Sequence, residues 1–375
     1  MRYNASVVQG NKPCPVCSVV NIEATVLIIS FILEVYPLQT KKFGRAVLGT
    51  LGVLLALLIV ASFCLGRYPV PVDQLGPILL DGLGVQVEQT WTNAMEATVM
   101  RIRLPRIILA CLVGCCLSSA GAAYQGVFQN PMAAPDLLGA SSGAAFGAAL
   151  AILLGGNAAM ITLSAFACSM ATVLLVNLVA ARAPGKKVVN LILAGVMVSS
   201  LFSAGTSYIK LVADPANQLP AITYWLMGSL SGSNMNSVTF ALPTMLLGLL
   251  PLILMRWRMN LLTLGDDEAR TMGVNTGRIR LMVVVCSTLV TAASVSVSGL
   301  IGWIGLVVPH LCRKLVGNDY RILMPCSMLL GAVFMLAVDD VSRNLMATEI
   351  PIGILTAFIG APFFLYLITR KETTL

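Results

Sequence analysis

Leu264-Gly-Asp-Asp-Glu-Ala-Arg-Thr-Met-Gly-Val-Asn-Thr-Gly-Arg-Ile-Arg280 is a polar stretch between two apolar ones. The first apolar stretch ends at Leu254 and the second starts near Leu281. Apolar stretches of about 20 residues predict helices that span a membrane. The polar stretch is therefore expected to be a loop between two membrane spans.

The same loop carries signals for a short helix. Three acids follow Gly265 and fit its first turn, where the helix dipole favours negative charge. Gly273 fits its C-terminal cap, and Asn275 or Thr276 is expected to cap a second short turn. A loop that only connects two spans needs no such helices, so we expect this one to bind another molecule.

The composition agrees with a membrane protein. The chain is 57% hydrophobic and 11% charged, whereas soluble domains carry about 25% charged residues. The apolar runs are continuous and do not alternate, which favours helices over a β-barrel. We predict an all-α polytopic protein with ten spans, at residues 46–66, 104–127, 136–154, 160–181, 189–211, 238–255, 281–298, 300–316, 323–346 and 351–369.

The net charge of +8 is explained by topology. With a cytoplasmic N-terminus, most of the 24 Lys and Arg residues fall on the cytoplasmic side, as the positive-inside rule requires. Both termini are therefore predicted to be cytoplasmic, and nothing calls for nucleic-acid binding.

Cysteine usage points to packing. Eight of the ten cysteines lie in or beside predicted spans, where they fit as small apolar side chains. Cys14 and Cys17 have CxxC spacing but no partners that would complete a metal site. They lie in residues 1–43, which are predicted to be a non-essential N-terminal extension, before a transmembrane domain at 44–370 and a cytoplasmic tail at 371–375.

The sequence lacks the motifs of several kinds of active site. There is no G-x-x-x-x-G-K-[ST] phosphate loop and no Ser/His/Asp set, so no catalytic residue, metal site or cofactor is predicted. Gly299, Gly302 and Gly305 are spaced by three and are expected to share one helix face for close packing.

Asp339-Asp340-Val-Ser-Arg343 is the one cluster of ionisable residues within a predicted span. Spacings of three and four let either acid pair with the arginine on a helix. We favour such a self-neutralising pair over a proton relay, which usually needs more acids along its path.

Motifs along the chain resemble the permease subunits of type II ABC importers, the FecCD/BtuC-like family for iron-siderophore, haem and cobalamin uptake. The resemblance runs from about residue 45 to 370. Its motif residues include Arg103, Pro105, Arg106, Gln125, Pro131, Gly139, Gly143, Pro309, His310, Arg313, Asp339, Pro351 and Gly353. It implies a homodimer with ten helices per subunit, in which helices 2–5 and 7–10 form an inverted repeat.

The resemblance also implies site roles. The loop after the sixth helix would bind the ATPase subunit through Leu264, Gly265, Asp266, Glu268, Ala269, Met272 and Gly273. Exposed Arg103, Arg106 and Arg343 would meet glutamates of a substrate-binding protein. The translocation pathway would be lined by small and polar residues, with Gln125, Asn130, Ser141, Ser142, Ser199, Ser203 and Ser207 as candidates.

The resulting prediction is the multi-pass permease of an ABC importer for ferric siderophores, in a bacterial or archaeal inner membrane. A binding lipoprotein or periplasmic protein would deliver the substrate, and a partner ATPase would use ATP and Mg. One alternative is a cobalamin or haem permease of the same family. The other is a secondary transporter driven by protons through Asp339 and Asp340.

Overall fold

The structure is a computed structural model that describes residues 41–66, 68, 70–82, 84–85, 87–185, 187–263, 266–273 and 275–369. Residues 1–40 form a separate unit from Lys41–Leu375. Residues 1–40, which include Cys14 and Cys17, lie outside the described residues. Leu264, Gly265 and the predicted tail also lie outside them.

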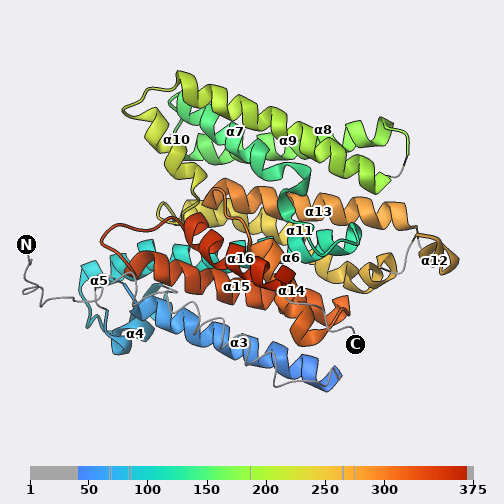
Figure 1. The fold of residues 1–375 in the computed structure, drawn as a ribbon. Helices are drawn as coiled ribbons and strands as arrows, with labels where there is room; N and C mark the ends of the chain where they lie inside the picture. Colours follow the sequence, from blue (N-terminus) through green and yellow to red (C-terminus); the bar gives the residue numbers. More distant parts are fainter. Residues whose placement is uncertain are drawn as a thin grey trace, which may run out of the picture. The chain divides into compact units, whose positions relative to one another are not determined.

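Ten helices in the described part of Lys41–Leu375 correspond to the ten predicted spans (Figure 1). Seven are long and apolar enough to cross a membrane. They are α3 (Lys41–Cys64), α6 (Leu104–Val127), α8 (Ala158–Arg182), α9 (Lys187–Val212), α11 (Met235–Leu262), α13 (Thr276–Ser298) and α15 (Tyr320–Asn344). Three are shorter: α7 (Ala140–Leu153), α14 (Ile304–Val316) and α16 (Ile352–Thr369).

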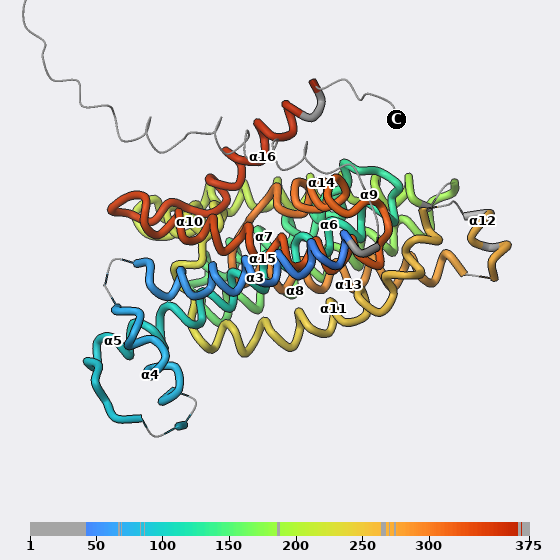
Figure 2. Tube along the Cα trace, turned by 90° about the horizontal axis from the view of Figure 1, so that it is seen from below, coloured from blue at the N-terminus to red at the C-terminus, as the bar shows by residue number. Residues whose placement is uncertain are grey.

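Short helices lie at both ends of this bundle. α4 (Val72–Gly82) and α5 (Asn93–Ala97) lie at one end, and α12 (Asp266–Thr271) lies at the other (Figures 1 and 2). A π-helical turn, η1 (Thr98–Arg103), leads into α6, and a 3-10 turn, η2 (Pro135–Leu138), leads into α7. α10 (Gln218–Leu226) follows α9. No strand occurs in the described ranges, which confirms the all-α prediction.

α6 is the central helix of the bundle. It packs against α11, α13, α14 and α15, and nearly all of its side chains are buried. Two glycines permit the close approach: a Cβ on Gly121 would lie 1.8 Å from the carbonyl oxygen of Gly305, and one on Gly114 would lie 2.2 Å from that of Gly331. Small residues therefore set the spacing of α6 from α14 and α15.

The two predicted repeats have matching architecture. In α6–α9 and in α13–α16 the second helix is the shortest, with 14 residues in α7 and 13 in α14. Each short helix follows an irregular segment with left-handed residues, which are Gln129 and Gly139 in one and Gly299 and Trp303 in the other. The second, third and fourth helices of each group also pack against one another in the same pairs. An offset of five helices reverses the direction of the second group, as an inverted repeat requires.

One glycine prediction is wrong. Gly299, Gly302 and Gly305 do not share a helix face, because α13 ends at Ser298 and α14 begins only at Ile304. Gly299 has φ 69° and ends α13, whereas Gly302 has no neighbour that an added Cβ would meet within 4 Å. Gly305 serves the expected close packing, against Gly121, whereas Gly299 lies against the carbonyl oxygen of Trp225.

Candidate functional site

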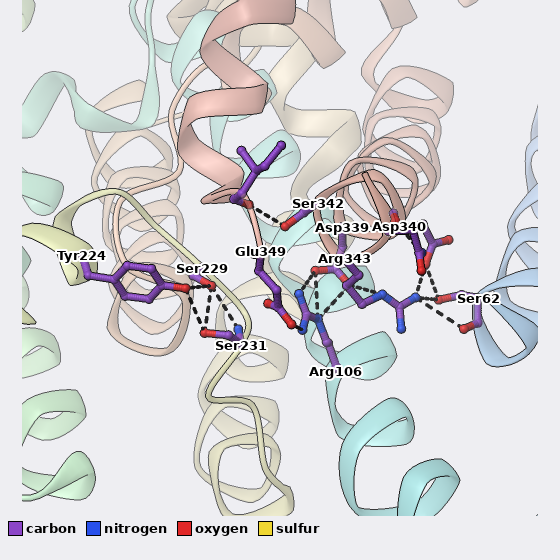
Figure 3. Close-up of polar contacts among 12 residues, drawn as sticks. Ser62, Arg106, Tyr224, Ser229, Ser231, Asp339, Asp340, Ser342, Arg343 and Glu349 are labelled. Carbon is purple, nitrogen blue, oxygen red and sulfur yellow. Dashed lines mark hydrogen bonds and ion pairs between the residues drawn. The ribbon is translucent and has the colours of Figure 1, made fainter. Parts of the chain in front are cut away.

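A buried cluster of charges lies at the end of the bundle that carries α4 and α5. We call it the arginine–aspartate cluster, and it comprises Ser62, Arg106, Asp339, Asp340, Arg343 and Glu349 (Figure 3). Its residues come from α3, α6, α15 and the segment between α15 and α16. The cluster therefore joins parts of the chain that lie far apart in sequence.

Arg106 and Asp339 form the centre of the cluster. The Arg106 guanidinium donates from Nε to Asp339 Oδ1 at 3.0 Å and to Oδ2 at 3.1 Å, and from Nη2 to Oδ1 at 2.9 Å. Its Nη1 donates to Glu349 Oε1 at 3.0 Å. Asp339 is fully buried, and a buried carboxylate is tolerated when it is paired and hydrogen-bonded.

Arg343 makes the pairs that the sequence spacing predicted. Its Nε lies 3.5 Å from Asp339 Oδ2, and its Nη2 donates to Asp340 Oδ1. Ser62 Oγ from α3 donates to Asp340 Oδ1 at 2.7 Å, and Arg343 Nη2 lies 2.6 Å from the same Oγ. The predicted pairing of the two acids with Arg343 is confirmed, with Arg106 and Glu349 as additional partners.

The expectation that Arg103, Arg106 and Arg343 are exposed is wrong. Their relative exposures are 3%, 4% and 8%. Arg103 donates to the carbonyl oxygens of Phe63 and Tyr68, and the other two arginines are paired with carboxylates of their own chain. Each guanidinium turns inward toward acceptors within the fold. Arg101, in contrast, is exposed at this end.

The opposite end of the bundle carries α12. It begins at Asp266, as the acidic first turn predicted, and Gly273 follows it with φ 76°, the left-handed conformation of a C-terminal glycine. Glu268 and Met272 are exposed, with Met272 at 60%, while Ala269 is fully buried. α12 thus has an inner side that is fixed to the protein and an outer side that is open.

Asn275 is a helix cap, but of a different helix from the one expected. Its side chain accepts from Arg278 N at 3.0 Å at the start of α13. The residues after Gly273 therefore form the first turn of a span, and the separate second short turn is a wrong prediction. Asp266 lies in α12, although its side chain is not among those described.

The predicted pathway residues fall into three environments. Gln125 is buried at 3% exposure and accepts from Arg313 Nη1, so the prediction that it lines the pathway is wrong in this conformation. Asn130, Ser141 and Ser142 lie around the irregular segment before α7, where Ser141 donates to Asp136 and Asn130 Oδ1 accepts from Met132 N. On α9, Ser199 is half-buried, and Ser203 and Ser207 are exposed.

The segment before α7 and the α9 serines are in contact. A Cβ on Gly139 would lie 2.5 Å from Ser199 Oγ, and one on Gly195 would lie 2.3 Å from the carbonyl oxygen of Leu137. Ser199 therefore lies against Gly139, which directly precedes α7. Ser203 and Ser207 continue along the exposed side of α9, together with Leu201, Tyr208 and Leu211.

The remaining motif residues shape the backbone. Gly143 allows α7 to approach Thr172 of α8, and Gly353 allows α16 to approach the carbonyl oxygen of Met227. His310 contacts the rings of Phe363 and Phe364. Of the proline motif residues, Pro105 is buried at the start of α6, Pro309 is buried within α14, Pro351 precedes α16 and Pro131 is exposed.

A cavity of about 1020 Å³ lies among the ends of α8, α10, α11 and α13. Its lining is mixed, with Asn157, Ser231 and Asn234 beside Leu163, Trp225 and Phe240. The hydroxyls of Tyr224, Ser229 and Ser231 lie within 3.1–3.5 Å of one another at its edge (Figure 3). None of its lining residues is ionisable apart from Tyr224.

Sequence reasoning missed several residues that hold the sites together. Ser62 and Glu349 complete the arginine–aspartate cluster, and Asn260 and Tyr320 join the last turn of α11 to the start of α15. Their hydrogen bonds cross between helices, so local spacing gave no signal for them. Glu349 is the one of these residues that lies close to a recognised motif in sequence, two residues before Pro351.

The fold and the two ends together define a class: a polytopic helical membrane protein with two inverted repeats and an exposed short helix between them. The family model of the FecCD transport family matches residues 54–370. The chain belongs to this family.

Known members are similar over most of their length. The molybdate import permease MolB of Haemophilus influenzae is 41% identical over 74% of this chain and 82% of its own. A permease of the iron chelatin transport system of Helicobacter pylori is 41% identical over 75% of this chain and 85% of its own. Other matching permeases are named for the import of cobalamin, hemin and Fe(3+)-citrate.

A solved structure has the same fold. An inward-facing metal-chelate type ABC transporter superimposes with a TM-score of 0.77 at 38% identity, over 86% of this chain and 99% of its own. The predicted fold class is confirmed, and this protein is a membrane permease of the ABC importer type.

Proposed function

We propose that this chain is the permease subunit of an ATP-driven importer of iron chelates, and of ferric siderophores in particular. The observation that carries the proposal is an exposed short helix, α12, on a bundle of the FecCD family. Relatives named for iron chelatin and Fe(3+)-citrate support iron chelates as the substrate class.

The chain itself hydrolyses nothing in this proposal and binds no cofactor. A separate ATPase subunit uses ATP and Mg, and it binds the outer side of α12 around Glu268 and Met272. Short charged helices with an exposed apolar side chain suit a partner groove. Because Ala269 is buried against the rest of the protein, a displacement of α12 is transmitted to the bundle.

The α12 end is proposed to be cytoplasmic. Basic residues gather there at helix ends: Arg182, Arg256, Arg258, Arg278, Arg280, Arg313 and Arg321. By the positive-inside rule, such an excess belongs on the cytoplasmic side. Both termini then lie in the cytoplasm, and the membrane is the bacterial or archaeal inner membrane.

The working unit is proposed to be a homodimer. Two helices, α9 and α16, carry large apolar side chains that this subunit leaves exposed, among them Leu201 at 67%, Leu211 at 80% and Phe358 at 69%. A partner copy would cover part of these surfaces. The pathway would then run between the copies, past Ser199, Ser203 and Ser207.

Docking of a substrate-binding protein is proposed at the α4–α5 end, next to the arginine–aspartate cluster. Glu349 has a side-chain exposure of 28% and occupies one edge of the Arg106 guanidinium. A glutamate of the binding protein would compete with it for Arg106. Exposed Arg101 would add a second contact without rearrangement.

The docking proposal has a direct binding test. The E349Q variant frees one edge of Arg106 and is expected to bind the binding protein more tightly, whereas R101E is expected to bind it more weakly. Affinity is measured on detergent-solubilised importer by surface plasmon resonance. If both variants bind like the wild type, docking does not involve these arginines.

Substrate class has a separate test. The cognate binding protein is titrated with ferric siderophores, haem, cobalamin and molybdate, and its intrinsic fluorescence is followed. We expect the binding protein to bind a ferric siderophore and none of the other three ligands. The relatives named for cobalamin, hemin and molybdate favour those as the alternative substrates, and tighter binding of any of them would reassign the substrate.

A further inference from the structure

A network of polar contacts holds the last turn of α11 to the rest of the bundle. Asn260 lies in that turn, and only Thr263–Gly265 separate α11 from α12. The Asn260 side chain donates from Nδ2 to Asp319 Oδ1 at 2.7 Å, and its Oδ1 accepts from Tyr320 N at 2.8 Å. One amide thus ties the segment that precedes α12 to the start of α15.

Tyr320 extends the network to the central helix. Its hydroxyl donates to the carbonyl oxygen of Ala122 on α6 at 3.0 Å and lies 3.4 Å from Arg313 Nη2. Arg313 Nη1 in turn donates to Gln125, one turn further along α6. Tyr320 is 2% exposed, and Gly126 leaves room for its hydroxyl, since a Cβ there would lie 2.5 Å from that oxygen.

A second hydrogen bond joins the segment after α6 directly to the last turn of α11. Gln129 stands two residues after the end of α6, and its Nε2 donates to the carbonyl oxygen of Leu262 at 2.8 Å. Gln129 has φ 49°, a left-handed conformation that non-glycine residues adopt at a cost. The surrounding contacts must hold this conformation. The end of α11 is therefore fixed to the end of α6 at two independent points.

α6 connects these contacts with the opposite end of the bundle. It is one continuous helix of 24 residues, with Ala122 and Gln125 near one end and Arg106 near the other. A buried helix of this kind moves as a body, because its neighbours pack closely along its length. A displacement of α11 at its last turn is therefore passed to α6.

We propose that Asn260, Tyr320 and Gln129 are positioning residues that fasten the segment before α12 to α6, so that movement of α12 drives α6. This rests on the proposed function, in which an ATPase moves α12. When the fastening is lost, ATP hydrolysis continues but moves less substrate.

The test uses the full importer, with its ATPase and binding protein, in proteoliposomes. The variants are Asn260→Ala, Tyr320→Phe and Gln129→Gly, and glycine accepts the left-handed conformation at position 129. The matched control is Asn177→Ala, because the Asn177 side chain donates only within its own helix, to Val173 O at 2.8 Å. ATP hydrolysis, uptake of a radiolabelled ferric siderophore and the Tm are measured for each.

Each network variant is expected to hydrolyse at least several-fold more ATP per substrate imported, with a Tm close to the wild type, while Asn177→Ala keeps the wild-type ratio. A ratio unchanged in all three variants overturns the proposal. A parallel fall of both rates with a lower Tm also overturns it, since that is a purely structural role. If the wild-type importer does not transport with ATP at all, the proposed function fails instead.

Discussion

Asp339 is the residue on which the arginine–aspartate cluster depends, because it accepts from Arg106 and lies beside Arg343 while fully buried. The D339N variant would remove one of two carboxylate partners from each guanidinium, leaving Glu349 for Arg106 and Asp340 for Arg343. Removal of one partner from a buried ion pair costs about 3–5 kcal/mol. We expect a clearly lower Tm in detergent and less folded protein in the membrane.

The matched control for that loss is E349Q. Glu349 pairs with the same Arg106, but its side chain is 28% exposed against 0% for Asp339, and contact with solvent weakens an ion pair. Its Tm should stay near that of the wild type. Equal losses for D339N and E349Q would contradict the central role of Asp339.

At this scale the sequence predicts contacts within a helix and misses those between helices. The pairing of Arg343 with Asp339 and Asp340 follows from spacings of three and four residues. Arg106 and Asp339 are 233 residues apart, so no local pattern joins them. The wrong expectation of exposed arginines has the same cause, since each arginine meets an acceptor from a distant part of the chain: Phe63 for Arg103, Asp339 for Arg106 and Ser62 for Arg343.

The contact of α6 with α14 is decided by Gly121. A Cβ at this position would lie 1.8 Å from the carbonyl oxygen of Gly305, so G121A must push the two helices apart. We expect a Tm lowered by several degrees and a strong loss of uptake. G52A is the control, because nothing lies within 4 Å of a Cβ on that α3 glycine. A wild-type Tm for G121A would refute this account of the packing.

The end of α12 is decided by backbone conformation. Gly273 has φ 76° with no neighbour within 4 Å of a built Cβ, so a substitution acts through φ and not through a clash. Placing an alanine in the left-handed region costs about 1–2 kcal/mol. G273A should reduce the uptake achieved per ATP hydrolysed, while substrate capture by the binding protein is unaffected.

The G273N variant distinguishes an effect of backbone conformation from an effect of any side chain at position 273. Asn adopts the left-handed conformation more readily than other non-glycine residues, so G273N should retain more coupling than G273A. If both variants import as much substrate per ATP hydrolysed as the wild type, the end of α12 has no part in coupling ATP hydrolysis to transport.

Element boundaries show what the sequence could and could not predict. The start of α12 at Asp266 and its end before Gly273 were predicted, because charge and glycine signals are local. The end of α13 at Ser298 agrees with the end of the predicted span, but the non-helical break from Gly299 to Trp303 was missed, since the spacing of Gly299, Gly302 and Gly305 fits one helix face equally well. That break depends on contacts such as Gly299 against the carbonyl oxygen of Trp225, 2.3 Å from a built Cβ.

At the scale of the whole molecule, the ten-helix prediction succeeded because each span coincides with one continuous apolar stretch of the sequence. The assembly around the chain is proposed from its two ends: α12 for an ATPase, and the arginine–aspartate cluster for a binding protein. α6 runs between them, which gives the importer a route from one partner to the other.

The most direct measurement of the central claim is the energy source of uptake. Cells that express this permease with its ATPase and binding protein are given a radiolabelled ferric siderophore, with and without an uncoupler, and with ATP depleted by arsenate. The account predicts that uptake survives the uncoupler and stops when ATP is depleted. Uptake that collapses with the uncoupler and survives ATP depletion would contradict it and would favour a proton-driven transporter acting through Asp339 and Asp340.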